Sequence, residues 1–181
     1  MISVQNISKS WGDRQVLKDF SYSFTGTTCI MGGSGIGKTT LAKIMAGLTP
    51  PDAGTVHHQG RLSFVFQEDR LLSGESMLTN LLFVRNNIPK AKALLSDLGL
   101  EEHTKKAHSL SGGMKRRVAL ARALMPDFDI LIMDEPFKGL DEALKHQAIN
   151  LINQYHQDKT IIVITHDPQD TALLHAKLLT L

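Results

Sequence analysis

The sequence predicts an α/β fold with a mainly parallel sheet, and three observations indicate this class. Residues 130–133 and 161–164 are short apolar runs followed by polar residues, as expected of buried parallel strands that carry functional groups at their carboxyl ends. Between these runs, Asp141 can cap a helix that crosses from one strand to its parallel neighbour. Earlier in the chain, residues 28–31, a glycine-rich turn and residues 38–48 have the pattern of a strand, a loop and a helix.

The remaining elements can be placed by periodicity and turn residues. Residues 2–7 and 16–24 alternate between apolar and polar side chains on either side of the turn-like pair Gly12-Asp13, which predicts antiparallel strands. The other predicted elements are short strands over residues 55–56 and 62–66, a helical stretch over residues 71–99, a helix from Ser111 to Pro126 and a last short strand over residues 177–181.

The composition limits the domain count, the location and the partners. With 181 residues, of which 42% are hydrophobic and 21% charged, the chain has room for one ordinary globular core. No apolar run approaches the roughly 18 to 20 residues that a membrane-spanning helix needs, so we expect a cytosolic chain. The net charge of +2 is too small to require nucleic acid or an anionic membrane surface as a partner. The single cysteine, Cys29, excludes an internal disulfide framework, and we expect it to be buried.

Residues 32–39 match the phosphate-binding loop pattern G-x-x-x-x-G-K-[ST]. Glycines let backbone N–H groups turn toward phosphate oxygens, and the helix that starts near Lys38 adds its positive dipole end. Lys38 supplies a mobile positive charge, Thr39 a hydroxyl where Mg²⁺ between two phosphates would lie, and Thr40 a second donor. The alternative is a strand-to-helix turn that binds nothing. The candidate phosphate ligands are Gly32, Gly33, Ser34, Gly35, Ile36, Gly37, Lys38, Thr39 and Thr40.

A phosphate loop of this kind needs an acidic residue on a second buried strand to hold the metal through water. Asp134 follows the apolar run 130–133 and meets this need, and Glu135 comes directly after it. Because adjacent residues point in different directions, Asp134 is the candidate metal ligand and Glu135 the candidate base that orients or deprotonates the attacking water. The alternative is that the acidic pair before Pro136 only marks the start of a helix.

The segment Leu110-Ser-Gly-Gly-Met114, followed by basic residues 115–117, resembles the signature sequence of ATP-binding cassette (ABC) ATPases. The resemblance covers nearly the whole chain, and the order and spacing of six motifs make it specific. The other matching motifs are Trp11 for the aromatic residue that stacks on adenine, Gln67 for the glutamine loop, residues 138–141 for the D-loop and His166 for the switch histidine. The alternative for Trp11 is a plain core position, and we expect the other histidines, His156 among them, to be exposed.

This resemblance implies the ABC ATPase architecture, which has a P-loop core, an antiparallel β-subdomain and an inserted helical subdomain. It also implies that two cassettes pack head to tail, so that each ATP lies between the phosphate loop of one chain and the signature of the other. The signature residues that would contact the partner's ATP are Ser111, Gly112 and Gly113. The implied catalytic residues are Glu135, His166, Gln67 and Lys38, and the implied Mg²⁺ ligands are Thr39, Gln67 and, through water, Asp134.

We expect residues 1–181 to form a single nucleotide-binding domain, with the helical subdomain inserted at about residues 70–125. The stretch from the phosphate loop to Gln67 is shorter than in most of the family, which predicts a shortened β-subdomain. Few residues follow His166, so no C-terminal regulatory domain is expected. The chain departs from the family pattern at Met114 and at residues 137–138, and the role of those side chains is left open.

The function that the resemblance implies is the ATP-binding and ATP-hydrolysing subunit of an ABC membrane transporter, lying peripherally on the cytoplasmic face of the cell membrane. The expected partners are a second ATPase subunit forming an ATP-dependent homodimer, integral membrane permease subunits and a solute-binding protein acting through the permease. No nucleic acid is expected. Residues 68–83 are the candidate docking surface, the alternative being a helical subdomain that packs on itself. The run 66–72 resembles bacterial importers of the nitrate, sulfonate and taurine group.

Two other functions compete with this one. A soluble ABC ATPase acting in DNA repair or on ribosomes has the basic patch of residues 115–117 as its only support, and a solvated helix face explains that patch equally well. A regulatory module that no longer hydrolyses ATP is disfavoured, because the phosphate-loop lysine, the acidic pair and the switch histidine are all present.

Overall fold

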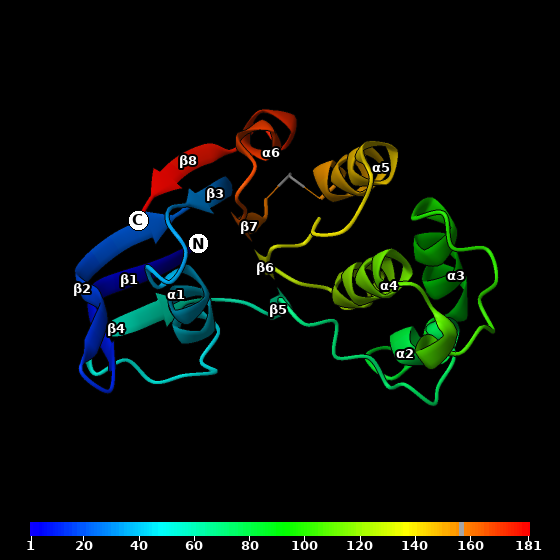
Figure 1. The fold of residues 1–181 in the computed structure, drawn as a ribbon, viewed down its shortest axis with the longest axis horizontal. Helices are drawn as coiled ribbons and strands as arrows, with labels where there is room; N and C mark the ends of the chain where they lie inside the picture. The colour runs from blue at the N-terminus through cyan, green and yellow to red at the C-terminus, as the bar shows by residue number, and fades with distance from the viewer. Residues whose placement is uncertain (156–157) are drawn as a thin grey trace.

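The computed structural model describes residues 1–155 and 158–181, and in it the chain folds into two sheets flanked by helices (Figure 1). His156 lies outside the described residues. The strands are β1 (Ile2–Trp11), β2 (Arg14–Phe24), β3 (Thr27–Met31), β4 (Ala53–His58), β5 (Leu62–Val65), β6 (Ile130–Asp134), β7 (Thr160–Ile164) and β8 (Lys177–Thr180). The helices are α1 (Lys38–Met45), α2 (Met77–Leu82), α3 (Ile88–Asp97), α4 (Gly112–Leu124), α5 (Glu142–Asn153) and α6 (Pro168–Leu173), with a 3₁₀ turn at Ala107–Ser109.

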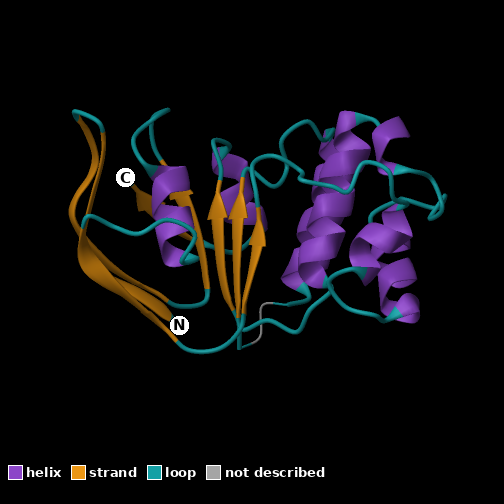
Figure 2. Ribbon diagram, turned by 90° about the horizontal axis from the view of Figure 1, so that it is seen from below, coloured by secondary structure: helices purple, strands orange, loops and turns teal. Residues whose placement is uncertain are grey.

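A parallel sheet with the strand order β5-β6-β7-β3-β8 forms the middle of the fold, which confirms the predicted α/β class. β6 and β7 are fully buried neighbours, with Asp134 opposite Ile164. α5 connects them as predicted, and Asp141 caps this helix by accepting a hydrogen bond from the Leu144 N–H. Because the strands of this sheet point the same way (Figure 2), the loops after β3, β6 and β7 emerge at one edge of the sheet.

The predicted antiparallel strands form the second sheet. β1 and β2 pair around the turn at Gly12, and β4 pairs with the other edge of β1. Alternate residues of the parallel strands separate two cores: Ile130 and Ile132 face the core shared with β1, β2 and α1, whereas Leu131 and Met133 face the core shared with α2 to α5. The parallel sheet therefore has the antiparallel sheet on one side and the α2–α4 helices on the other (Figure 2).

The continuous helical stretch predicted over residues 71–99 is wrong in its extent. The chain is irregular up to Ser76, whose hydroxyl accepts a hydrogen bond from the Thr79 N–H and starts α2. A second break follows α2, and Asn87 caps α3, which has Pro89 in its first turn. Each cap accepts a hydrogen bond from one of the unpaired N–H groups at a new helix start, so the chain forms two short helices.

Burial agrees with the expectations for the cysteine and for most of the histidines. Cys29 is fully buried on β3, and this burial raises the pKa of its thiol to about 11, which keeps it protonated near neutral pH. His103 is half-buried, whereas the exposed histidines outside the predicted site are His57, His58, His108, His146 and His175. In the described part of the chain, every helix is too short or too polar to span a bilayer.

Candidate functional site

The loops after β3, β6 and β7 surround a cleft of about 390 Å³. The cleft lies where the phosphate loop, two strand ends and the β1–β2 hairpin meet, and it brings together most of the predicted ATP-site residues. Ser111, Gly112 and Gly113 are not among the described residues that line it. The predicted residues that do line it are Trp11, Ser34, Gly35, Gly37, Lys38, Thr39, Thr40, Gln67, Glu135 and His166.

The phosphate loop has a backbone that requires glycine. Gly37 has a φ of 112° and caps α1, and a Cβ at this position would lie 2.6 Å from the Val16 carbonyl oxygen. Lys38 is buried, and its Nζ donates hydrogen bonds of 2.8 Å to the carbonyl oxygens of Gly32 and Gly33. The ammonium group is therefore held over the loop at the N-terminus of α1, where the helix dipole also favours an anion.

Trp11 lies at the end of β1 with 54% of its surface exposed, so the alternative of a plain core position is wrong. Its Nε1 donates a hydrogen bond of 3.3 Å to Thr40 Oγ1, and Lys9 Nζ lies 5.1 Å from the ring centroid. These contacts hold the indole beside the phosphate loop. An exposed ring in this place can stack on a planar base.

Asp134 ends β6 directly before Glu135 and is almost completely buried, and it is not among the described residues that line the cleft. Burial raises the pKa of its carboxyl, and a hydrogen bond from Thr39 partly opposes this shift. Among the described residues, its Oδ1 atom has no hydrogen-bond partner. A buried carboxylate oxygen without a donor, beside a threonine hydroxyl at a phosphate loop, fits the oxygen ligands that Mg²⁺ prefers. Gln67 lines the same cleft and can supply another oxygen.

Asp134→Asn is expected to stabilise the free protein while it removes Mg²⁺-dependent activity. Because the folded-state pKa of Asp134 is raised, this carboxyl favours folding when protonated and loses that contribution as pH rises through the folded-state pKa. An amide removes the cost of the buried charge, which we expect to raise the free energy of unfolding at pH 8 by about 1 kcal/mol, or roughly 2–4 °C in Tm.

Thermal unfolding in EDTA measures this gain, with the exposed turn variant Asp13→Asn as a control. The gain from Asp134→Asn should shrink as pH falls toward the ordinary aspartate pKa of 3.8. If Asp134→Asn is less stable than the wild type at pH 8, the ionised carboxylate stabilises the folded protein, and the expected cost of burying its charge is wrong.

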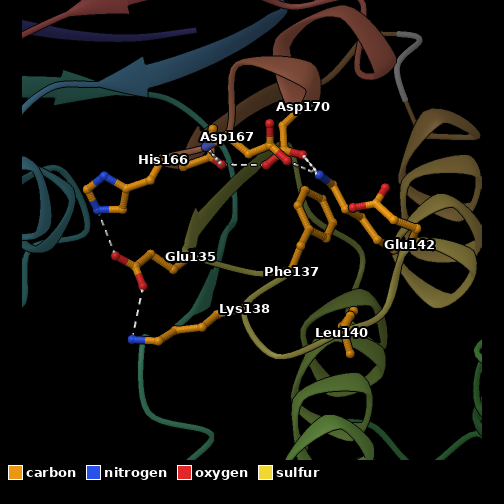
Figure 3. Close-up of a pocket in the computed structure, with 10 residues that line it drawn as sticks. Glu135, Phe137, Lys138, Leu140, Glu142, His166, Asp167 and Asp170 are labelled. Atoms are coloured by element: carbon orange, nitrogen blue, oxygen red, sulfur yellow. Dashed lines mark hydrogen bonds and ion pairs between the residues drawn. The ribbon is translucent and has the colours of Figure 1, made fainter.

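Glu135 and His166 meet at the cleft from the ends of β6 and β7 (Figure 3). His166 Nε2 lies 3.0 Å from Glu135 Oε1, and Lys138 Nζ lies 3.4 Å from Glu135 Oε2. Glu135 has a φ of 48°, which is uncommon for a residue other than glycine, and its N–H donates a hydrogen bond of 2.9 Å to the Ile164 carbonyl. This bond anchors the turn to β7, so the strained backbone places the carboxylate beside the phosphate loop, as a general base requires.

The signature segment forms the start of α4, and its residues do not line the cleft. Ser111 caps the helix as predicted, since its Oγ accepts a hydrogen bond of 3.3 Å from the Met114 N–H. Ser111 and Gly112 are exposed, and a Cβ on Gly113 would lie 3.2 Å from the Gly139 carbonyl oxygen. The signature therefore packs beside the D-loop and leaves a capped helix N-terminus facing outward.

Arg116 was not among the predicted site residues, and its environment corrects the interpretation of the basic patch. Arg116 and Arg117 are only 3% and 8% exposed, so the patch is not a solvated helix face. Arg117 binds the carbonyl oxygens of Leu98 and Gly99. The guanidinium of Arg116 joins the glutamine loop to the end of β6, and its carbonyl acceptors are Phe66 (2.6 Å), Gln67 (3.3 Å), Asp134 (2.6 Å), Glu135 (2.8 Å) and Pro136 (3.1 Å).

A phosphate loop that opens a helix, next to an acidic strand end on a parallel sheet, defines the class of P-loop nucleoside triphosphatases. Within this class, the sequence profile of the ABC transporter family matches residues 18–138. The chain is 32% identical to an uncharacterized ABC transporter ATP-binding protein of Haemophilus influenzae, over 100% of this chain and 82% of that protein. It is 40% identical to the aliphatic sulfonates import ATP-binding protein SsuB 1 of Rhodococcus jostii, over 83% of this chain and 66% of that protein.

Solved structures agree with the sequence relatives. The dimeric structure of a bacterial ABC transporter cassette matches the chain with a TM-score of 0.92 at 26% identity, over 100% of this chain and 94% of the other. A post-hydrolysis dimer of an ATP-binding cassette with bound ADP and phosphate matches with a TM-score of 0.91, also at 26% identity and with the same coverage. The chain belongs to the ABC transporter ATPase family, and it is an ATPase that binds ATP.

Proposed function

We propose that two copies of this chain close around two ATP molecules and that the dimer supplies energy to a membrane importer. The observation that carries this proposal is the exposed N-terminus of α4, which lies outside the cleft of its own chain. A helix N-terminus with a serine hydroxyl suits a phosphate group, and a partner chain can bring one. The similar cassette structures are dimers, which supports this arrangement. Because every predicted motif lies on one chain, two identical chains would complete two sites.

Each predicted catalytic residue of the cleft has a separate role in ATP hydrolysis. Lys38 neutralises phosphate charge, and His166 donates a hydrogen bond to the γ-phosphate. Glu135 orients the attacking water or takes its proton. Mg²⁺, held through Thr39, Gln67 and Asp134, would supply charge neutralisation at the β- and γ-phosphates. Once the γ-phosphate has left, the contacts that favour the closed dimer are lost and the two chains separate.

A permease would dock on the helical part of the chain, which we propose is an insert over about residues 70–125 in one nucleotide-binding domain. Met77 is buried, so part of the predicted docking surface packs inward, as the alternative for residues 68–83 expected. A group of exposed apolar side chains indicates a protein-binding surface, whereas single exposed apolar side chains do not. The exposed ones here are Leu72, Phe83, Val84 and Ile88.

The direction and the solute class come from the relatives. SsuB 1 of Rhodococcus jostii is named for the import of aliphatic sulfonates, so we propose an importer of small organic anions. Such a subunit would work on the cytoplasmic face of the membrane, and a solute-binding protein would deliver the solute to the permease. The soluble alternative has lost its one support, because Arg116 and Arg117 bind carbonyl oxygens inside the protein.

Copurification tests the transporter assignment. The tagged chain, expressed in its native cell and extracted with a mild detergent, is expected to bring down a protein with several membrane spans. The double variant Phe83→Asp/Val84→Asp should lose that partner and keep its ATPase activity, whereas Leu178→Asp, at an exposed site on β8, should keep both. Recovery of ribosomes or DNA-repair proteins in place of a membrane protein would establish the soluble alternative.

A further inference from the structure

Lys145 is a buried lysine on α5 that no part of the proposed mechanism uses. Only 5% of its surface is exposed, and it is the fourth residue of α5. Its Nζ forms ion pairs with Asp167 and, at 2.7 Å, with Asp170. Lysine is seldom buried without a partner, because its charge must be compensated when water is excluded. Two carboxylates from one short segment provide that compensation.

Both carboxylates belong to the segment that carries His166. The Asp170 carboxylate accepts a hydrogen bond from the Thr165 hydroxyl, and the same hydroxyl accepts one of 3.1 Å from the Asp167 N–H. Asp167 also caps α6 by accepting a hydrogen bond from the Gln169 N–H. The residues on both sides of His166 are therefore tied to each other and, through Lys145, to α5.

The side chain of His166 has little support of its own. It is exposed, and the contact that the structure shows is the one with Glu135 (Figure 3). A second cleft, of about 510 Å³, separates the D-loop from the segment around His166, and both Lys145 and His166 line it. Because the cleft leaves the imidazole of His166 without packing on that side, its position depends on the backbone that carries it. The ion pairs of Lys145 fix that backbone.

The charges of the cluster support its rigidity. Burial disfavours the charged form of Lys145, but the two aspartates outweigh this effect and raise the pKa of the lysine. The hydrogen bond from Lys145 in turn lowers the pKa of Asp167. Lys145 and Asp170 are both buried, whereas Asp167 is partly exposed. Removal of one partner of a buried ion pair strongly destabilises a protein, so the Lys145–Asp170 pair is the stronger tie between α5 and the segment after β7.

We propose that Lys145 is a positioning residue for hydrolysis, which holds the Thr165–Asp170 segment so that His166 reaches the γ-phosphate. Because α5 begins at Glu142, directly after the D-loop (residues 138–141), Lys145 also links the D-loop to the switch histidine within one chain. This inference rests on the proposed function, since it needs His166 to act on ATP.

A double-mutant cycle of Lys145→Met and His166→Ala in the full chain tests the proposal. On its own, Lys145→Met is expected to lower kcat about 10- to 100-fold, because small misplacements of catalytic groups have effects of this size. ATP affinity, measured with a fluorescent analogue, should change less than about twofold. In the His166→Ala background, Lys145→Met should cause no further loss of kcat, because the two residues act in one unit. Lys145→Arg should restore most of the activity.

The possible outcomes separate this inference from the proposed function. If His166→Ala leaves kcat unchanged, the role of His166 in the proposed function is wrong. If His166→Ala lowers kcat but Lys145→Met lowers it by the same factor in both backgrounds, His166 keeps its role and the positioning role of Lys145 is overturned. Lys159→Met is the control for loss of a lysine ion pair, since Lys159 Nζ lies 3.9 Å from Asp129 Oδ1 at the opposite end of β7, and it should leave kcat unchanged.

Discussion

Glu135→Gln is expected to bind ATP as the wild type does and to lower multiple-turnover hydrolysis by a factor of about 10² to 10⁴, the usual contribution of a general base. The amide keeps the size of the side chain and a contact for His166, which lies 3.0 Å from the carboxylate, but it cannot accept a proton from water. ATP would then persist in the closed state, so dimers should accumulate when ATP is added. Steady-state phosphate release and size-exclusion chromatography with multi-angle light scattering measure the two effects.

The control for this variant is Lys138→Gln, which removes the other charged neighbour of the Glu135 carboxylate. Lys138 is an exposed residue, and surface ion pairs contribute little, so this change should alter kcat by less than about threefold. A Glu135→Gln protein that retains full multiple-turnover activity would rule out Glu135 as the base.

Arg116→Met is expected to cause the largest loss of stability among single changes near the site. It leaves several buried carbonyl oxygens of the glutamine loop and of the β6 end without their donor. Loss of a buried charged group from such a network typically lowers the free energy of unfolding by about 3–5 kcal/mol. Urea denaturation in the absence of nucleotide measures this loss.

Variants at neighbouring positions show whether the donor geometry of Arg116 matters. Arg116→Lys keeps the charge, but an ammonium group cannot donate to the glutamine loop and to the end of β6 at once as the planar guanidinium does. This variant should therefore recover only part of the lost stability. Lys115→Met changes the adjacent, partly exposed residue and should shift the free energy of unfolding by less than about 0.5 kcal/mol. Equal stability of Arg116→Met and the wild type would show that the carbonyl oxygens find other partners.

Local sequence patterns predict the parts of this protein whose structure depends on short-range interactions, such as strands, turns and helix caps. The apolar runs of β6 and β7, the glycines of the phosphate loop and the caps Ser111 and Asp141 all have the structures that their sequence predicts. Residues 71–75 are irregular although their pattern predicts a helix, because Leu71 and Leu72 continue the apolar spacing of α2 but Ser76 caps that helix by accepting a hydrogen bond from the Thr79 N–H.

The burial of Arg116 and Lys145 is not predicted, although the positions of these two residues on their helices indicate it. Arg116 shares one face of α4 with Leu120 and Leu124, at a spacing of four residues, and Lys145 shares one face of α5 with Ile149. A charged residue in an apolar stripe must have partners, but the sequence does not say which ones. Here Arg116 pairs with the Asp69 carboxylate and donates to backbone carbonyl oxygens from loops about 20 and 50 positions away, and only the tertiary structure brings these partners together.

In the proposed dimer, the phosphate loop of one chain and the signature of another form a single ATP site. Mixing two inactive variants tests this composite site: Lys38→Ala disables the phosphate loop, and Ser111→Arg disables the signature. Each variant alone should hydrolyse ATP at no more than about 1% of the wild-type rate, because a homodimer of either lacks any complete site. In a mixed dimer, Lys38 of one chain meets Ser111 of the other, so ATPase activity should reappear on mixing. A mixture of two folded variants that stays as inactive as its components would contradict the composite site.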